Sequence, residues 1–270
     1  MKRLILGAAL VLLLAGLAAG QEESAGQPQA PSARQIIERS QLAFYYQGDD
    51  MKADIAMELI DKAGGKRMRV MTMLRRDQTE GGNQKYFIYF HEPGDVRRLT
   101  FMVWKYPDKE DERWIFIPAV DLVRRIAADD KRASFVGSDF TYEDVSGRDP
   151  AADTHTLLGE ARLQERDCFL IQSVPLAPTE YTRRLVWIDQ ETLLPMQEEY
   201  YDIQNELFRV FTADRIEELA FPTVTRRTMT NVKTGHRTEV TYRSVSYNLG
   251  LKDEDFSERQ MRRPPRAWIR

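Results

Sequence analysis

The feature of this sequence that most constrains its fold is a long series of short segments in which apolar and polar residues alternate. In the first segment Ile55, Met57 and Leu59 recur at every second position, and after a Gly-Gly turn the same period resumes over 66–74. A period of two places alternate side chains on opposite faces of a β-strand, so these two segments predict a hairpin. The further candidate strands are 84–91, 99–106, 112–117, 154–163, 167–174, 182–189, 195–202, 206–214, 215–221, 224–232 and 237–247.

Turn residues separate the candidate strands about every 8–14 residues, as at Pro93-Gly94 and Pro222. Many short antiparallel strands at even spacing predict a sandwich or a barrel. A few helices accompany them. Ser32 is placed to cap a helix over 33–47, and a short helix over 140–145 could be capped at position 138 or 139. The sequence therefore predicts a mainly β fold with a few helices.

Three of the candidate strands, 86–90, 101–104 and 114–117, are apolar on both faces. A strand of this kind has a cover on each side, because a sheet with one face in water alternates cleanly. The cover could be helices of the same chain or a bound apolar ligand, and ordinary core packing also accounts for the pattern. Methionines concentrate in the first hairpin and would suit an exchangeable apolar surface. The candidate residues for an apolar cavity are Met57, Met71, Met73, Phe87, Tyr89, Met102, Trp104, Trp114, Phe116, Phe135, Phe140 and Tyr142.

The start of the chain has the order of a secretory signal peptide over 1–20. Lys2 and Arg3 precede an apolar run, and small residues follow up to Gly20, after which cleavage is expected. The run is shorter than the roughly 20 residues that span a bilayer, so an uncleaved anchor is the less favoured alternative. A lipoprotein would carry Cys where this chain has Gln21. The mature protein is therefore expected to be periplasmic, without a lipid anchor or a membrane span.

The mature chain is expected to contain one folded domain, over 34–261. A linker at 21–33 is polar, rich in small residues and contains proline, a composition typical of disorder. The basic, proline-containing segment 262–270 predicts a flexible tail. Residues 1–20 hold two of the 39 basic residues and none of the 42 acidic ones, so their removal makes a formal charge of −3 more negative. A mildly acidic chain gives no electrostatic reason to expect a nucleic-acid partner.

The residues that usually mark chemistry are sparse. His91, His155 and His236 are the three histidines, and none has the spacing of a zinc site. No nucleotide or nucleophile motif is present, so no catalytic residue, metal or cofactor is expected. The single cysteine, Cys168, excludes an intramolecular disulfide. It begins a candidate strand, which favours a buried, inert thiol over a reactive one.

Two charged groups leave alternatives open. Asp139, Glu143 and Asp144 could form an acid–base pair or a site for a hard cation. Helix capping and ion pairing with Arg124, Arg125 or Arg132 are favoured instead, since nothing marks a nucleophile. Arg124 and Arg125 could contact a lipid headgroup phosphate or a membrane partner, because arginine offers a forked donor. A structural or surface salt bridge is the favoured alternative for them.

Residues 90–145 resemble the family of exported bacterial outer-membrane lipoprotein-sorting proteins, relatives of the periplasmic lipoprotein carrier LolA. Weaker similarity continues over the mature chain as far as Phe256. The sequence departs from the family pattern at Arg98-Leu99, where a glycine or small residue is expected beside Thr100. The matching pieces are Pro93-x-Asp95-x-Arg97, Trp104, Trp114-Ile115-Phe116-Ile117-Pro118-Ala119, Val123-Arg124-Arg125-Ile126 and Ser134-Phe135-Val136-Gly137-Ser138-Asp139-Phe140-x-Tyr142-Glu143-Asp144.

The resemblance implies a curved, incompletely closed antiparallel β-barrel wrapped around a few helices, with an apolar cavity between them. It implies a non-enzymatic periplasmic carrier that shields the acyl chains of lipid or lipoprotein cargo. An inner-membrane exporter or a lipoprotein-release complex is a possible partner. The alternative is a periplasmic sensing module that uses the same cavity to regulate a membrane partner.

Overall fold

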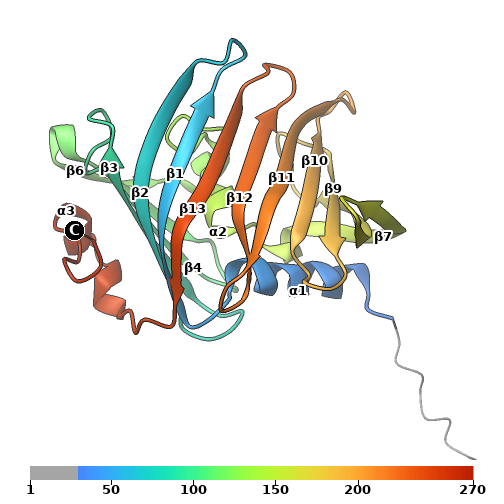
Figure 1. The fold of residues 1–270 in the computed structure, drawn as a ribbon, viewed down its shortest axis with the longest axis horizontal. Coiled ribbons are helices and arrows are strands. Elements are labelled where there is room, and N and C mark those ends of the chain that lie inside the picture. Colours follow the sequence, from blue (N-terminus) through green and yellow to red (C-terminus); the bar gives the residue numbers. More distant parts are fainter. Residues whose placement is uncertain (1–29, 270) are drawn as a thin grey trace, which may run out of the picture. The chain divides into compact units, whose positions relative to one another are not determined.

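The protein, seen here as a computed structural model that describes residues 30–269, is built on a single antiparallel sheet (Figure 1). The expected signal peptide and nearly all of the expected linker lie outside the described residues. The thirteen strands are β1 (Asp50–Ile60), β2 (Lys66–Asp77), β3 (Gln84–Glu92), β4 (Thr100–Lys105), β5 (Glu112–Ile117), β6 (Leu122–Ile126), β7 (Asp153–Leu163), β8 (Arg166–Pro175), β9 (Arg183–Asp189), β10 (Pro195–Tyr201), β11 (Leu207–Glu218), β12 (Pro222–Asn231) and β13 (Arg237–Tyr247).

The strand order determines where the rest of the chain must run. Strands β1 to β6 form one meander and β7 to β13 a second, and the two are joined where β1 pairs with β13. As a result β6 and β7, which are consecutive in the chain, lie at opposite edges of the sheet (Figure 1). The connection between them, residues 127–152, therefore crosses the sheet from edge to edge. This crossing segment is the structural basis of the site described below.

Within residues 30–269, three α-helices and four short 3-10 helices accompany the sheet. The first helix, α1 (Ala33–Tyr45), begins at the predicted cap, where Ser32 and Gln35 form a capping box. In the crossing segment, α2 (Tyr142–Ser146) is capped by Thr141 with Asp144, so the cap expected at 138 or 139 was wrong. The remaining helices are α3 (Glu258–Arg262), η1 (Pro118–Val120), η2 (Ala128–Arg132), η3 (Pro150–Ala152) and η4 (Asp253–Phe256).

The strands that are apolar on both faces are covered on both sides by the chain itself. On one face, which we call the inner face, β-strand side chains pack against Phe135, Phe140 and Val145 of the crossing segment. On the opposite, outer face, a second cluster packs against Phe256 and Met261 of the C-terminal segment. The crossing segment and the C-terminal segment are thus two separate covers of one sheet.

The sheet stays open: β6 and β7 are its edges and do not pair with each other. The predicted fold, a curved and incompletely closed antiparallel sheet with a few helices, is confirmed. Residues 262–269, where a flexible basic tail was expected, instead pack on the outer face, with Ile269 buried and Trp268 Nε1 donating to Asp255 at 3.1 Å. Their apolar residues anchor them although their arginines are exposed. Within residues 30–269 no helix has the length and apolar character that crossing a bilayer requires.

Candidate functional site: an apolar interior beneath a helical cover

The floor of the candidate site is the inner face of the first hairpin and its neighbours. Met51, Met57, Met71 and Met73 point to this face and are all buried. Methionine side chains are flexible and polarisable, so a surface rich in them can repack around different apolar partners. The inner face therefore offers an adaptable apolar floor.

The roof of the site, here called the inner cover, consists of α1 and the crossing segment. Phe135 and Tyr142 of the crossing segment stack around Phe101 of β4, with ring centroids 5.3 and 5.1 Å away. From α1, Phe44 packs against Phe211 of β11 at 6.1 Å. These aromatic contacts close the interior over both meanders.

The candidate cavity residues fall into two groups on opposite faces. Strand alternation alone explains the separation: on β3, Phe87 and Tyr89 point outward while Ile88 and Phe90 point inward. The six that lie at the interior are Met57, Met71, Met73, Phe135, Phe140 and Tyr142. The six that lie on the outer face, under the C-terminal segment, are Phe87, Tyr89, Met102, Trp104, Trp114 and Phe116.

The interior is filled mainly by the protein's own side chains. Cavities of about 30, 50 and 80 Å³ lie between sheet and inner cover, and a wider pocket of about 480 Å³ opens beside the end of α1, where Tyr46 and Phe221 line it. On this measure one water needs roughly 10–15 Å³, and small-molecule pockets usually measure about 300–1,000 Å³. The smallest cavity has an almost wholly apolar wall that includes Met57, Met71 and Met73. An acyl chain would enter only if the inner cover moved.

Buried charged side chains, rather than apolar contacts alone, hold the end of α1 to the sheet. Arg75 on β2 donates to the carbonyl oxygens of Tyr45 at 2.8 Å and Gly48 at 2.9 Å, and also to that of Gln47. Its Nε lies 3.3 Å from Asp77 Oδ1. Burial raises the pKa of Asp77 to about 6, against the opposing effect of Arg75. This carboxyl is therefore a titratable part of the attachment.

Lys105 at the end of β4 holds α2 in the same way. Its buried Nζ donates to the carbonyl oxygens of Ser146 at 2.6 Å and Gly147 at 2.8 Å, at the C-terminal end of the helix. A cation at this end of a helix is favoured by the unpaired carbonyls there. Burial nevertheless lowers the pKa of Lys105 to about 8.

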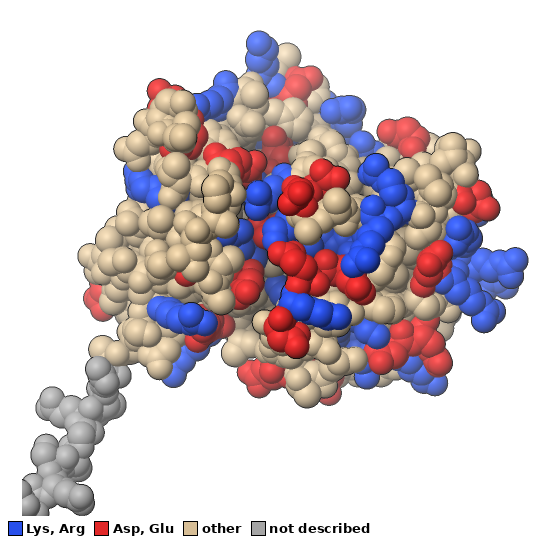
Figure 2. All heavy atoms as spheres, turned by 180° about the vertical axis from the view of Figure 1, so that it is seen from behind, with Lys and Arg blue, Asp and Glu red and all other residues tan. Residues whose placement is uncertain are grey.

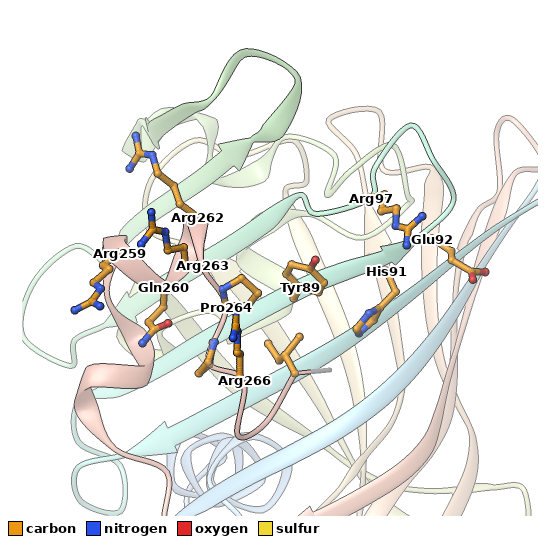
Figure 3. A pocket seen from close by; sticks show the side chains of 12 residues that line it. Tyr89, His91, Glu92, Arg97, Arg259, Gln260, Arg262, Arg263, Pro264 and Arg266 are labelled. Atoms are coloured by element: carbon orange, nitrogen blue, oxygen red, sulfur yellow. The ribbon is translucent and has the colours of Figure 1, made fainter.

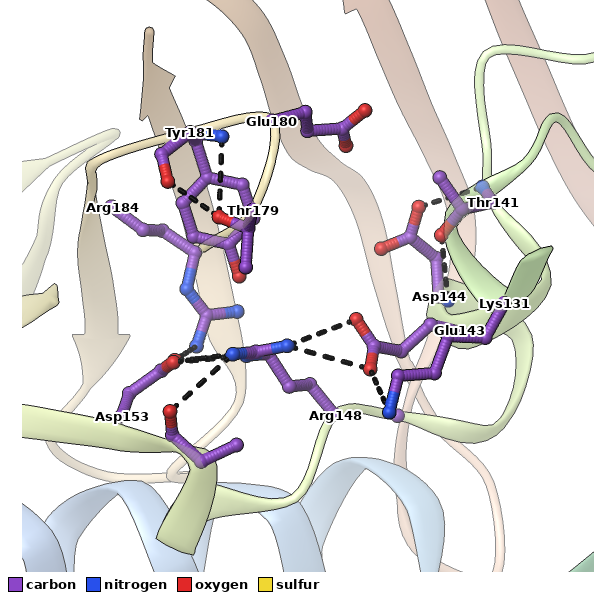
Figure 4. Close-up of polar contacts among 12 residues, drawn as sticks. Lys131, Thr141, Glu143, Asp144, Arg148, Asp153, Thr179, Glu180, Tyr181 and Arg184 are labelled. Carbon is purple, nitrogen blue, oxygen red and sulfur yellow. Dashed lines mark hydrogen bonds and ion pairs between the residues drawn. The ribbon is translucent and has the colours of Figure 1, made fainter. Parts of the chain in front are cut away.

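On the β7–β13 side, ion pairs connect the crossing segment to the sheet (Figure 4). Arg148 lies between Glu143, at 3.2 Å, and Asp153, at 2.7 Å. Arg209 on β11 is 3.2 Å from Asp144. Acidic and basic side chains gather on this face of the molecule, which Figure 2 shows from behind.

These contacts settle the geometry of the three carboxylates considered as an acid–base cluster. Asp139 accepts from Thr238 Oγ1 at 2.7 Å and lies 2.6 Å from His236 Nδ1, while Asp144 accepts from the backbone N–H of Thr141 at 2.8 Å. This geometry agrees with the favoured interpretation as capping and ion-pairing groups. Asp144 caps α2 and pairs with Arg209, and Glu143 pairs with Arg148, so the arginine partners differ from those expected. In the part of the chain that the structure describes, no group of three metal-ligating side chains comes together.

One cationic group faces the interior without a carboxylate beside it. Arg227 on β12 lines two of the three cavities and donates to Tyr242 Oη at 2.8 Å. The rings of Phe44 and Phe140 lie 5.4 and 5.6 Å from its guanidinium carbon. Among residues 30–269 no acidic oxygen lies within 4.0 Å of it. Arg227 and Asp144 are thus the two charged residues among those that line the apolar cavity.

The two arginines proposed for headgroup contact lie away from the interior. Arg124 and Arg125 are exposed on the edge strand β6. Arg125 is 3.1 Å from Glu112, and its guanidinium carbon lies 6.0 Å from the ring of Trp114.

Cys168 is buried and its pKa is raised to about 11 by burial, which confirms the expected buried cysteine.

Comparison with known proteins identifies the family. A family model described as "Uncharacterized protein" matches residues 82–263. A DUF1329 family protein from Desulfovibrio piger and a domain from Vibrio parahaemolyticus assigned to outer membrane lipoprotein sorting each share 26% sequence identity with the chain at a TM-score of 0.78. The chain belongs to the family that this family model describes, and it is similar to a DUF1329 family protein and to a protein assigned to outer-membrane lipoprotein sorting.

The two structures cover 85% and 86% of this LolA-like chain, and 97% and 98% of their own lengths. A LolA superfamily protein from Nitrosomonas europaea, 16% identical over 85% of this chain and 99% of its own, has the same fold at a TM-score of 0.65. No curated protein sequence matches the chain. The match thus extends over the sheet and both of its covers.

The residues that hold the inner cover in place could not be recognised from the sequence pattern. Arg75, Lys105 and Arg209 are charged, yet each lies in a strand at an inward-pointing position and is buried. The sequence does contain one indication of them: each is a charged residue at a position that strand alternation places on the apolar face. Their partners are backbone carbonyls and acids far away in the chain, which the sequence does not reveal.

Proposed function

We propose that this LolA-like protein is a periplasmic, non-enzymatic carrier that accepts the acyl chains of lipid or lipoprotein cargo between its sheet and its inner cover. The observation that carries the proposal is the methionine-rich apolar floor, which lies beneath a cover that buried charged groups attach to the sheet. The relative from Vibrio parahaemolyticus, assigned to lipoprotein sorting, supports it. The signal peptide expected over residues 1–20 supports export to the periplasm.

In this proposal the closed interior is the empty state, and cargo exchanges with the protein's own side chains. Entering acyl chains displace Phe135 and Phe140 from the methionine floor, so one apolar contact replaces another. The free energy of opening is then small enough for release as well as uptake, which a carrier requires. Arg227, near the cavity floor, would meet the polar end of the cargo.

Binding of a fluorescent palmitic acid analogue tests this proposal. Met73→Phe places a rigid ring beside the apolar cavity and is expected to weaken probe binding, with an overpacking cost of about 1–3 kcal/mol in stability. Met68→Phe is the matched control, since Met68 lies on the same strand but is 45% exposed. It should bind the probe as the unaltered protein does.

Lys105→Met tests the motion of the inner cover. The substitution removes the donor to Ser146 and Gly147 while leaving a side chain of similar length, so probe uptake should become faster. Lys62→Met, at an exposed turn position, should leave the uptake rate unchanged. The carrier proposal fails if two results are obtained together. The unaltered protein does not bind the probe, and the protein purified from the periplasm yields no lipid on extraction.

A further inference from the structure

A large cavity lies on the outer face, away from the apolar interior. It is an open groove of about 1,110 Å³ between the C-terminal segment and the end of β3 with the loop that follows (Figure 3). Tyr89 and Ile269, which belong to the outer cluster, lie at its base. Its volume slightly exceeds the usual range for small-molecule pockets, about 300–1,000 Å³.

Positive charge dominates the walls of this groove, which we call the basic groove. Arg259, Arg262, Arg263 and Arg266 come from the C-terminal segment, and Arg97 comes from the opposite wall. Glu92 is the one acidic residue among those that line it. The chain as a whole carries a formal charge of −3, so the groove concentrates charge of the opposite sign. Such a cleft raises the local concentration of anions.

The arginines of the groove differ from those of the inner face in their partners. Arg262 lies 3.3 Å from Glu258 and 3.5 Å from Asp121. Within the described chain, the other four have no acidic oxygen within 4.0 Å, whereas Arg148 and Arg209 on the inner face are each paired with acids. Forked guanidinium donors without protein acceptors are available to a ligand that carries oxygen acceptors.

The scaffold holds the arginine-bearing wall in place. Thr100 Oγ1 donates to the carbonyl oxygen of Met261 at 3.1 Å, and Trp104 Nε1 donates to that of Phe256 at 3.0 Å. Met261 and Ile269 are buried between the exposed arginines. The charges are therefore presented by an anchored segment, which reduces the entropy lost when a ligand binds.

The remaining wall adds neutral donors and no further acid. His91 Nε2 lies 2.9 Å from Thr72 Oγ1, and its ring packs edge-on against Tyr89 at 5.0 Å. Burial lowers the pKa of His91, so at neutral pH it adds no charge to the groove. Gln260 contributes an amide beside the arginines. Arginine forks with neutral donors around them form a setting suited to phosphate oxygens.

We infer that the basic groove binds a ligand that carries phosphate groups. Its five arginines on two facing walls match a multiply charged anion better than a single carboxylate, and its volume exceeds what one inorganic phosphate fills. The phosphate could belong to the headgroup of an anionic lipid or to a soluble molecule. The inference does not rest on acyl-chain binding, because the groove and the interior lie on opposite faces of the sheet.

The experiment uses pyrophosphate in calorimetric titrations, and flotation with vesicles of phosphatidylglycerol or of phosphatidylcholine. The test variant, Arg97→Gln with Arg266→Gln, removes one exposed arginine from each wall. It should weaken binding about 10-fold for each arginine removed. The matched control, Arg67→Gln with Arg243→Gln, removes the same charge from exposed positions on β2 and β13 and should bind as the unaltered protein does.

The two ligand sources give different results. Pyrophosphate binding that the test variant loses assigns the groove to soluble phosphate-bearing molecules. Binding to phosphatidylglycerol vesicles alone, lost in the same variant, assigns it to a lipid headgroup. The inference is overturned if the unaltered protein binds neither, or if test and control variants lose affinity equally, since that result would reflect net charge and not the groove.

Discussion

Strands β3 to β5 carry similar apolar side chains on both faces, but the two covers of these strands are attached by different means. The C-terminal segment on the outer face is held by buried apolar side chains, of which Phe256 is wholly buried, together with hydrogen bonds from the neutral donors of Thr100 and Trp104 to its carbonyl oxygens. The inner cover is held in addition by buried charges that bond to its backbone carbonyls, notably Arg75 and Lys105. Apolar anchoring suits a permanent cover, whereas a few discrete bonds can break and re-form together.

Removing the main apolar anchor of the outer cover should have the largest effect. Phe256→Ala is expected to lower the free energy of unfolding by about 3–5 kcal/mol, as for other fully buried phenylalanines. Trp104, Trp114 and Trp268 belong to the outer cluster, so their fluorescence should shift as this cover loosens. Chemical denaturation followed by tryptophan emission measures both effects.

The control for this variant is Ile203→Ala, at a side chain that is 80% exposed. Its stability should stay close to that of the unaltered protein. An equally small loss for Phe256→Ala would show that the outer cover contributes little to the fold.

The inner cover should respond to pH through Asp77. Its pKa is raised from 3.8 to about 6 in the fold, so between these values the folded state binds more protons than the unfolded state. The contribution of Asp77 to stability is complete below pH 4 and is lost as pH rises to about 6, a loss of roughly 3 kcal/mol. Asp77→Asn should abolish this part of the pH dependence.

Denaturation curves at a series of pH values measure this pH dependence of the free energy of unfolding. Asp108→Asn, at an exposed position, is the control. If the unaltered protein and Asp77→Asn change stability in parallel from pH 4 to 6, the carboxyl is not held in the buried setting described here.

A weaker element of the inner cover is the capping box of α2. Thr141→Ala removes the hydroxyl that accepts from the backbone N–H of Asp144 at 3.1 Å and should cost about 1 kcal/mol. Hydrogen exchange should accelerate in the crossing segment and not in the C-terminal segment. Thr156→Ala, at an exposed position on β7, should leave both rates unchanged; acceleration in both segments would mean that the two covers open as one unit.

The smallest expected effect concerns the loop between β3 and β4. Arg98 has a φ of 67°, in the region that favours glycine, where the family pattern also leads us to expect a glycine or small residue. Arg98→Gly should therefore raise the free energy of unfolding by about 0.5–1 kcal/mol. Arg98→Ala keeps the Cβ atom and should give no comparable gain in thermal unfolding, and a gain of equal size would exclude backbone strain as the cause.

Most strand positions could be predicted from the sequence because the strands either alternate or form short apolar runs bounded by turn residues. The exceptions have local causes. Residues 206–221 were predicted as two strands, but β11 is continuous, with register shifts around Ala213 and Arg215 that interrupt the alternation. Strand β6 was missed because Arg124 and Arg125 break its apolar pattern. A bulge or an exposed edge changes the pattern without ending the strand.

The candidate site was only half predictable. Apolar character identified Met57 and Phe87 alike, yet they lie on opposite faces. Which side each strand turns inward depends on pairing across the sheet. The bond from Arg209 to Asp144 joins residues 65 positions apart, and such pairs form only when the crossing segment is in place. The sequence could not show which face the C-terminal segment occupies.

The crossing segment has a mechanical consequence for how far the sheet can open. Its ends are fixed in β6 and β7, the two edges of the sheet, so the chain between them acts as a strap of limited length. The sheet can flatten or spread only as far as this strap allows. An α-helix rises about 1.5 Å per residue, a 3-10 helix about 2.0 Å and extended chain about 3.3 Å, so unwinding η2, α2 or η3 would lengthen it. The residues held in these helices thus set how far the crossing segment can lengthen and, with it, how far the sheet can widen.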